Sequence, residues 1–291
     1  MDKRLRNLIA MAFRPEHTGP AENFYDEKES AKYHSSSRIV RIQTELAQRC
    51  IELLNLPEGK QGLVLDIGCG SGLSGEVLQE AGHAWVGTDV SPKMLEIAND
   101  KEEANGDVML HDMGMGMPFR PGCFDGAISV SAVQWLSYSN DASHTPRKRL
   151  HAFFSTLYSC LKRGARAVLQ LYPESPEQME MISGAAMKCG FGGGLVVDFP
   201  NSAKAKKCYL CLFAGQDVTT DTHIPAALGT EAAGVDVAKR KQLQKQRRRP
   251  EKASVKSRGW VKAKKDRQRK QGKDVRPDSK YTARRRAGKG W

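Results

Sequence analysis

Short apolar runs alternate with helix-forming segments between residues 63 and 189, and this alternation limits the fold more than any other feature. A strand–helix–strand order requires crossover connections, which build a parallel sheet covered by helices on both faces. The predicted strands are 63–66, 84–89, 107–112, 124–131 and 166–172, and the predicted helices are 39–54, 73–81, 93–103, 147–163 and 175–189. The sequence therefore predicts an α/β fold with a doubly wound sheet.

Two further apolar runs, 195–199 and 208–213, complete the predicted sheet. The segment between them, Pro200 to Lys207, leaves no room for a helix, so the two runs should pair as an antiparallel hairpin. The sheet then has seven strands and ends in a β-hairpin, a departure from an ordinary dinucleotide-binding domain.

The positive charge of the chain is concentrated at its C-terminal end. Residues 239–291 hold 23 Lys and Arg against four Asp and Glu, whereas the first 238 residues hold 23 against 29. A segment this basic, with few apolar side chains, cannot offset its own ordering entropy and is predicted to be disordered. We divide the chain into an N-terminal segment (1–35), a core domain (36–215), a linker (216–238) and a basic tail (239–291).

A glycine-rich turn, Asp66-Ile-Gly68-Cys-Gly70-Ser-Gly72, joins the first predicted strand to its helix. Glycines let the backbone approach a ligand at the helix N-terminus, although a plain βα turn would also use them. The spacing is GxGxG, whereas a diphosphate-binding turn has GxGxxG. Asp66 at its start suits a ligand that carries an amino group and repels a diphosphate.

Two further carboxylates end the next two predicted strands. Asp89 lies where a carboxylate can accept both hydroxyls of a ribose. Asp112 is followed by Met113, a pair suited to an adenine amino group and ring. An adenosine ligand with an ammonium group and no phosphates is S-adenosylmethionine.

Motifs along most of the chain resemble one family of RNA-modifying enzymes. They are Arg14-Pro-Glu-His17, Phe24-Tyr-Asp26, Gly87-Thr-Asp-Val-Ser-Pro92, Asp112-Met-Gly-Met-Gly116, Ser129-Val-Ser-Ala-Val-Gln-Trp-Leu136, Leu169-Gln-Leu-Tyr-Pro173 and Asp198-Phe-Pro-Asn-Ser-Ala-Lys-Ala-Lys-Lys207. With the glycine-rich turn, these motifs resemble the eukaryotic small-subunit (18S) rRNA (guanine-N7)-methyltransferase family, which has the class I methyltransferase fold. Residues 1–13 have no counterpart in the resemblance.

The resemblance implies S-adenosylmethionine as cofactor and the small-subunit rRNA of a pre-ribosome as substrate. It assigns cofactor binding to Asp66, Gly68, Cys69, Gly70, Gly72, Asp89, Val90, Asp112, Met113 and Ser129. It also implies a nuclear location, in nucleolus and nucleoplasm, with the cytoplasm as a further site. Guanine N7 keeps a free lone pair, so no general base is expected and no catalytic residue is assigned.

Tyr25 and Trp135 are the candidate substrate-binding residues. An aromatic face can stack on the target base and stabilise the cation left on methylated guanine. Both side chains could equally be packing residues of the core.

Met109, Met113, Met115 and Met117 cluster on and after the third strand, the expected edge of the sheet. They could fill the adenine pocket and its loop, or form a soft apolar docking surface. The resemblance favours docking, because enzymes of this kind work with a small zinc-binding activator subunit, in a heterodimer. The zinc would belong to that partner, so no metal site is predicted in this chain.

The seven cysteines are scattered, and the sequence predicts reduced thiols, no signal peptide and no membrane span. Cys208 and Cys211 form the only CxxC, but on a strand the two side chains face opposite sides and cannot hold one metal ion. A buried strand is therefore predicted there.

Three other functions compete with the rRNA methyltransferase. An NAD-dependent oxidoreductase is disfavoured by Asp66, and a small-molecule methyltransferase by the basic tail. A non-catalytic assembly factor remains open, since its fold and tail could scaffold pre-ribosomes. The tail itself could serve nuclear import alone or also contact rRNA phosphates.

Overall fold

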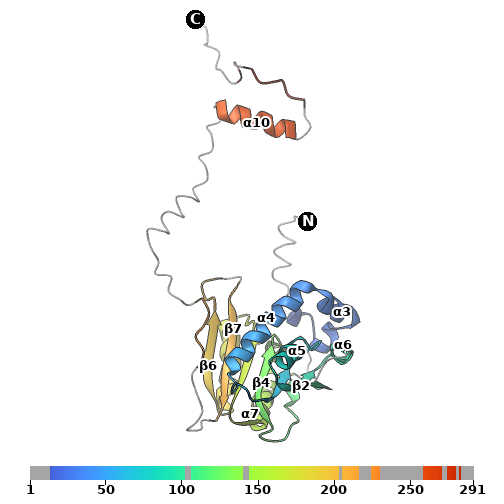
Figure 1. The fold of residues 1–291 in the computed structure, drawn as a ribbon, viewed down its shortest axis with the longest axis vertical. Coiled ribbons are helices and arrows are strands. Elements are labelled where there is room, and N and C mark those ends of the chain that lie inside the picture. Colours follow the sequence, from blue (N-terminus) through green and yellow to red (C-terminus); the bar gives the residue numbers. More distant parts are fainter. Residues whose placement is uncertain are drawn as a thin grey trace. The chain divides into compact units, whose positions relative to one another are not determined.

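The computed structural model describes residues 14–101, 106–139, 144–202, 205–215, 224–229, 258–270, 274–279 and 282. The chain divides into two compact units, Met1–Thr230 and Glu231–Trp291, and each is described by itself. The first unit holds the sheet and its covering helices (Figure 1).

The elements of the first unit follow one another in the order that the sequence predicts from residue 37 onward. Its helices are η1 (Pro15–His17), α2 (Ala21–Phe24), α3 (Glu27–Ser35), α4 (Ser37–Leu54), α5 (Leu73–Glu80), α6 (Pro92–Asn99), η2 (Met113–Met115), η3 (Val133–Ser137), α7 (Pro146–Cys160) and α8 (Pro176–Lys188). Its strands are β1 (Leu63–Ile67), β2 (Ala84–Asp89), β3 (Gly106–Leu110), β4 (Phe124–Val130), β5 (Leu161–Leu171), β6 (Phe191–Asp198) and β7 (Lys207–Ala214).

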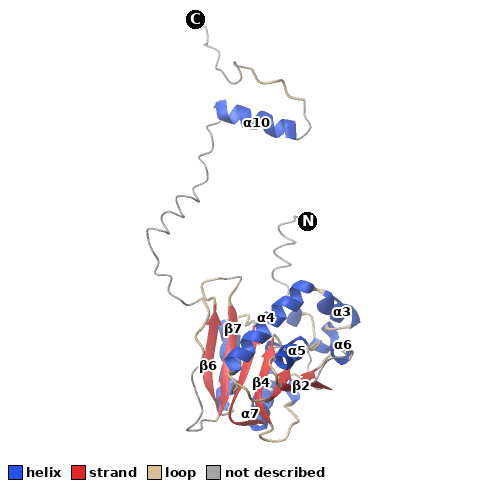
Figure 2. Cartoon of the chain, in the orientation of Figure 1, coloured by secondary structure: helices blue, strands red, loops and turns tan. Residues whose placement is uncertain are grey.

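The seven strands form one sheet in the order β3-β2-β1-β4-β5-β7-β6. The first five strands are parallel, and β7 pairs antiparallel with both β5 and β6. Helices cover both faces of the sheet (Figure 2). This confirms the predicted class I methyltransferase fold, including the C-terminal hairpin.

Two apolar cores lie on the two faces of the sheet. The core under α4 and α5 includes Leu53, Leu78 and Trp85, and the core under α7 and α8 includes Phe153, Phe154 and Ile182. The strands between them are apolar on both faces, as expected for a parallel sheet covered twice. Among the described residues, no helix combines the length and the apolar character that a membrane span requires.

The structure differs from the sequence prediction most clearly at two junctions. In addition, α6 ends at Asn99 and not at residue 103, and β6 begins at Phe191 and not at residue 195. In the N-terminal segment, where no helix or strand is predicted, the structure has α2 and α3, and Asp26 caps α3 by accepting the Glu29 amide at 2.8 Å. The helix predicted to continue to residue 163 ends at Cys160, where β5 starts at once. Gly164 has φ +81° and lies within this long strand instead of ending the helix, at an irregularity in the β4–β5 pairing.

The C-terminal hairpin is tied to the start of the domain by a buried ion pair. Arg49 Nε on α4 donates to Asp198 at 3.0 Å, and both side chains are almost fully buried. Asp198 also accepts the Leu228 amide at 2.8 Å, and Arg49 donates to the Ala226 carbonyl at 2.9 Å. The described part of the predicted linker, residues 224–229, therefore belongs to the first unit and is held by Arg49 and Asp198.

Cys208 and Cys211 both lie on β7 and are buried, which confirms the predicted core strand. No group of three or more potential metal ligands occurs within the part of the chain that the structure describes.

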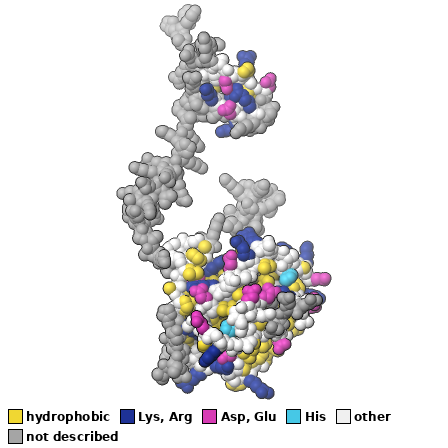
Figure 3. Space-filling model, in the orientation of Figure 1, with side chains coloured by type: hydrophobic (Ala, Val, Ile, Leu, Met, Phe, Trp, Pro, Cys, Tyr) yellow, Lys and Arg dark blue, Asp and Glu magenta, His cyan; other side chains and the backbone are white. Residues whose placement is uncertain are grey.

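The second unit contains α10 (Arg258–Lys270), a helix that the sequence analysis does not predict. Lys265 and Arg269 on this helix both contact the carboxylate of Asp278, at 2.9 and 3.0 Å. Lys265 and Arg269 are one helical turn apart, so their shared contact with one carboxylate stabilises this part of α10. Lys and Arg side chains gather around α10 (Figure 3). The rest of the predicted disordered tail lies outside the described residues, apart from 274–279 and 282.

Candidate functional site

A cavity lies at the carboxyl ends of β1, β2, β3 and β4, where doubly wound sheets bind ligands. The segment before the sheet and the turns after the strands supply its walls. Its lining includes Pro20, Ala21, Glu22, Tyr25, Tyr33, Gln43, Gly68, Gly70, Asp89, Val90, His111, Asp112, Met113, Ser131, Trp135, Tyr138, His144 and Arg149.

The glycine-rich turn forms one wall of this cavity. Gly68, Gly70 and Gly72 all have positive φ, at +71°, +53° and +79°. A Cβ added to Gly68 would lie 2.3 Å from the Cβ of Ala132, so this glycine is also required by packing. The Gly68 and Cys69 amides donate to the Thr88 carbonyl at 2.7 and 3.0 Å, which holds the turn against β2.

We expect Gly68→Ala to lower the free energy of unfolding by about 2–5 kcal/mol, since the left-handed backbone and the clash with Ala132 add. It should also weaken cofactor binding, because the turn must shift. Gly82→Ala is the matched control: Gly82 has φ +82° but no atom within 4 Å of its added Cβ. Urea denaturation of both variants measures the difference, and equal losses for the two would show that the contact with Ala132 is not limiting.

Asp89 lies at the end of β2, half-buried in the cavity wall. Its carboxylate accepts the Gly70 amide at 2.9 Å and the Ser91 amide at 2.8 Å. Burial raises the pKa of Asp89, and the backbone amide donors oppose that rise. The two amides fix both oxygens at the cavity, and each oxygen retains a lone pair for a ligand hydroxyl.

Asp112 is paired with a cation that the sequence analysis does not identify. Arg149 Nη2 donates to its carboxylate at 2.6 Å, and the Gly114 amide donates to the same oxygen at 2.9 Å. The glycine at position 114 leaves room for Arg149, since a Cβ there would lie 2.2 Å from Arg149 Nε. This glycine is the feature of the sequence that could have indicated the pair. Arg149 also contacts His144 at 2.5 Å. Met113 lines the cavity beside this cluster.

Asp66 lies beneath the glycine-rich turn, outside the lining of the main cavity. It is fully buried, and Ser74 Oγ donates to one of its oxygens at 2.6 Å. The other oxygen has no hydrogen-bond partner, and burial raises the pKa of Asp66 to about 7. Cys69 lines a smaller hollow that shares Tyr33 and the turn with the main cavity.

Two other predicted cofactor residues also lie off the main cavity. Gly72 is the N-cap of α5. Ser129 is fully buried, and its hydroxyl donates to the Ile67 carbonyl at 2.7 Å, which joins β4 to β1. Its neighbour Val130 lines the cavity in its place.

Aromatic side chains form another part of the cavity wall. Tyr25 and Trp135 both line it, with ring centroids 6.1 Å apart and planes tilted by 55°. Phe24 lies 6.1 Å from Trp135, and Tyr33 lies 6.0 Å from Tyr25. Burial raises the pKa of both tyrosines, so both stay neutral at physiological pH.

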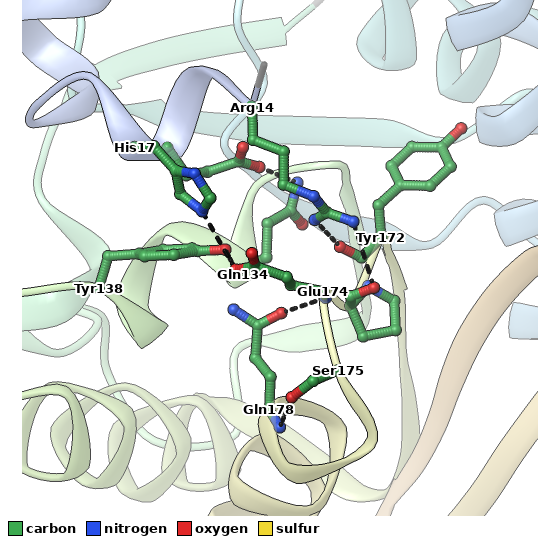
Figure 4. A network of polar contacts seen from close by, with 10 residues as sticks. Arg14, His17, Gln134, Tyr138, Tyr172, Glu174, Ser175 and Gln178 are labelled. Atoms are coloured by element: carbon green, nitrogen blue, oxygen red, sulfur yellow. Dashed lines mark hydrogen bonds and ion pairs between the residues drawn. The ribbon is translucent and has the colours of Figure 1, made fainter. Parts of the chain in front are cut away.

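A polar network holds the N-terminal segment in place over the site (Figure 4). Arg14 donates to the Tyr172 and Pro173 carbonyls at 2.7 and 3.3 Å. His17 contacts Glu174 at 3.1 Å, and the Tyr138 hydroxyl donates to the same carboxylate at 2.8 Å. The segment from η1 to α3 is therefore part of the site, although it precedes the predicted core domain.

Comparison with known proteins decides the family. A model described as "Methyltransferase involved in Williams-Beuren syndrome" matches residues 212–288, and a methyltransferase domain model matches 65–169. The 18S rRNA (guanine-N(7))-methyltransferase of Mus musculus is 56% identical over 283 residues, which are 96% of this chain and 99% of the relative. The 18S rRNA (guanine(1575)-N(7))-methyltransferase of Saccharomyces cerevisiae is 43% identical over 274 residues, 94% of this chain and 98% of the relative. The chain belongs to the 18S rRNA (guanine-N7)-methyltransferase family.

A solved structure supports the fold of this family member. A putative S-adenosylmethionine-dependent methyltransferase from Methanococcus maripaludis has a TM-score of 0.51 at 15% identity, over 66% of this chain and 95% of that one. The fold is thus shared beyond the range of clear sequence similarity.

The residues present fit the cofactor that the family uses. Asp89 and Asp112 face one cavity from neighbouring strand ends, and the orphaned oxygen of Asp66 is a buried acceptor under the turn. Among the residues lining the cavity, the cation Arg149 is committed to Asp112, which leaves no evident partner for a diphosphate. A ligand with an ammonium group and no phosphates matches this charge distribution.

Several residues of this site in the family member were missed by sequence reasoning. Tyr33 and Gln43 line the cavity from segments with no local motif, and His111 directly precedes the Asp112 motif at the end of the third predicted strand. Ser131 has φ +58°, and its hydroxyl donates to Gln170 at 2.7 Å across the sheet. A non-glycine residue held in this conformation often marks a functional position, but no pattern in the sequence reveals its φ.

Proposed function

We propose that this chain transfers the methyl group of S-adenosylmethionine to N7 of a guanine in 18S rRNA during assembly of the small ribosomal subunit. The observation that carries this proposal is identity of 43–56% to curated 18S rRNA (guanine-N7)-methyltransferases over nearly the whole chain. The cavity, which is lined by carboxylates and aromatic side chains, is the site where this reaction would take place.

The reaction requires that the two reactants are positioned, and it does not require a base that removes a proton from guanine. Bound S-adenosylmethionine supplies a methyl group on a sulfonium, which N7 takes with its free lone pair to leave a neutral thioether. The chain's own contribution is to hold the two reactants in line and to exclude water. Asp89 would accept the ribose hydroxyls, Asp112 and Met113 would contact the adenine, and Asp66 would supply a negative charge beneath the turn for the ammonium group.

Tyr25 and Trp135 are suited to the target base. Their ring planes are inclined at 55° to each other, and both rings line the cavity. The product guanine carries a positive charge. Aromatic faces attract that charge, so the contact strengthens as the methyl group is transferred.

The partner is proposed to be a small zinc-binding activator subunit that pairs with the edge strand β3. Leu110 on β3 is 59% exposed and Met115 just beyond it is 79% exposed, whereas Met117 belongs to the core and Met113 lines the cavity. An exposed apolar edge strand is a site where another chain can add a strand. Met115 would therefore serve docking together with Leu110, and Met109, which is half-buried on β3, would lie beside them.

The basic tail supports the proposal that this protein is nuclear and binds RNA. Its excess of cations would contact rRNA phosphates, and its Lys and Arg clusters would suit nuclear import, in nucleolus and nucleoplasm with the cytoplasm as a further location. The exposed cations of α10 include Lys262, Lys264 and Arg267, which belong to a preformed helix.

The function is tested on small-subunit precursor particles from cells that lack this enzyme. The purified chain with its activator should transfer isotope-labelled methyl to one guanine, detected by borohydride and aniline cleavage of the 18S rRNA. The same mixture with Asp89→Ala should leave the rRNA unlabelled. Label on a different atom or base, or none from a chain that binds S-adenosylmethionine, would refute the proposal.

A further inference from the structure

We infer that Glu22 selects guanine by accepting hydrogen bonds from the N1–H and N2–H groups of the target base. This inference rests on the proposed function and names the side chain that reads the base. It concerns an exposed residue of α2 that lines the cavity together with Pro20, Ala21 and Tyr25.

Glu22 is the carboxylate of the cavity that remains available to a ligand base. Of the three acids that line the cavity, Asp89 accepts two backbone amides and Asp112 holds Arg149. Among the described residues, Glu22 makes no hydrogen bond or ion pair. The nearby acids Glu16 and Glu174 are bound to Gln134 and to His17 with Tyr138.

Glu22 lies close in sequence to the aromatic surface that would stack on the base. Tyr25, three residues further along, provides this surface with Trp135, and these residues line one cavity with Gly68, Gly70 and Asp89. A base that stacks on this surface and turns N7 toward the cofactor turns its N1 and N2 groups away from the cofactor. Glu22, on the N-terminal segment that lines the cavity, is the acceptor that we assign to these groups.

The chemistry of the base gives this contact its selectivity. Guanine presents two parallel donors at N1 and N2, which a carboxylate accepts with both oxygens. Adenine presents an acceptor at N1, so a carboxylate there would repel it. Methylation also leaves a positive charge on guanine, and a fixed negative charge beside the base stabilises the transition state.

The test compares guanine with inosine at the target position, because inosine lacks only the N2 amino group. Synthetic target RNA of both kinds is methylated by the chain–activator complex, and kcat/KM is measured for each. Wild-type protein should prefer guanine by about 10–100-fold, the effect of one hydrogen bond to a charged group. In Glu22→Gln, kcat/KM for the guanine RNA should fall by about 30-fold or more. The variant should prefer the guanine RNA over the inosine RNA by less than about threefold.

Glu27→Gln is the matched control, since it removes the same charge from an exposed position on α3 outside the cavity. It should keep the wild-type rate and preference. Unchanged affinity for S-adenosylmethionine in Glu22→Gln would show that the variant is folded. A Glu22→Gln enzyme that still prefers guanine as strongly as wild type overturns the role of Glu22. Wild-type protein that methylates no guanine overturns the proposed function itself, and the assignment with it.

Discussion

Replacing Asp89 with alanine should lower the affinity for S-adenosylmethionine by at least about 100-fold. Two hydrogen bonds from ribose hydroxyls to a charged acceptor contribute roughly 3–6 kcal/mol, and a factor of 10 in affinity corresponds to about 1.4 kcal/mol. The structure adds a second cause, because Asp89 also holds the amides of Gly70 and Ser91. Asp89→Asn separates the two causes, since the amide keeps one acceptor oxygen in nearly the same place.

Isothermal titration calorimetry on each variant measures this effect, with thermal unfolding as the test of fold. Asp125→Asn is the control, because Asp125 also accepts a backbone amide, from Leu63 at 3.0 Å, but lies at the start of β4, away from the cavity. It should bind the cofactor as wild type does. Unchanged binding by a folded Asp89→Ala protein would contradict the assignment of this carboxylate.

Asp66→Asn should make the unliganded protein more stable at pH 8 while it weakens cofactor binding. The pKa of Asp66 is raised from 3.8 to about 7, so folding takes up a proton between these values. The free energy of unfolding of the wild type therefore falls as pH rises from about 4 to about 7, and the neutral asparagine escapes this loss. The gain at pH 8 is on the order of 2–4 kcal/mol, and it vanishes near pH 4.

Urea denaturation at pH 4.5 and pH 8, without ligand, measures the difference between the two proteins. In calorimetry the same variant should bind S-adenosylmethionine more weakly, because the amide lacks the negative charge that attracts the ammonium group. Asp125→Asn should instead be less stable than the wild type at pH 8, by an amount that shrinks as the pH falls. Burial alone would raise the pKa of Asp125, but its ion pair with Lys162 lowers the pKa in the folded state. Parallel pH profiles for wild type and Asp66→Asn would show that Asp66 is not the source of the pH dependence.

The sheet could be predicted from the sequence because each strand and helix has a local signal. Apolar runs, helix caps and glycine punctuation place β1 to β7 in the right order, and the short β6–β7 connection specifies the hairpin. The junction of α7 and β5 was wrong because the helix was predicted to run as far as residue 163, next to Gly164, whereas Gly164 lies inside β5. Helices α2 and α3 were missed because they are short and polar, and packing against the site supports them more than their own periodicity does.

The carboxylates of the site could be predicted because parallel strands end at one edge of a sheet. Asp89, Asp112 and Trp135 meet at the cavity for that reason. Arg149 and Tyr33 were missed because they reach the cavity from helices distant in sequence. Ser129 shows the limit of strand-end reasoning: one residue along a strand reverses the face of the side chain, so Val130 faces the cavity and Ser129 the interior.

The buried pair of Arg49 and Asp198 has a consequence for the order in which the domain is made. The two residues are 149 positions apart, and Asp198 is held in turn by the Leu228 amide. During synthesis Arg49 leaves the ribosome long before Asp198, and until then its carboxylate partner among the described residues is the exposed Glu52, one turn along the same helix at 2.7 Å. A buried guanidinium is stabilised best by a counter-ion that is buried with it, so the first helix of the domain reaches its full stability against the sheet only when the last hairpin has emerged. This enzyme of ribosome assembly therefore completes its own fold only when translation of the domain is nearly finished.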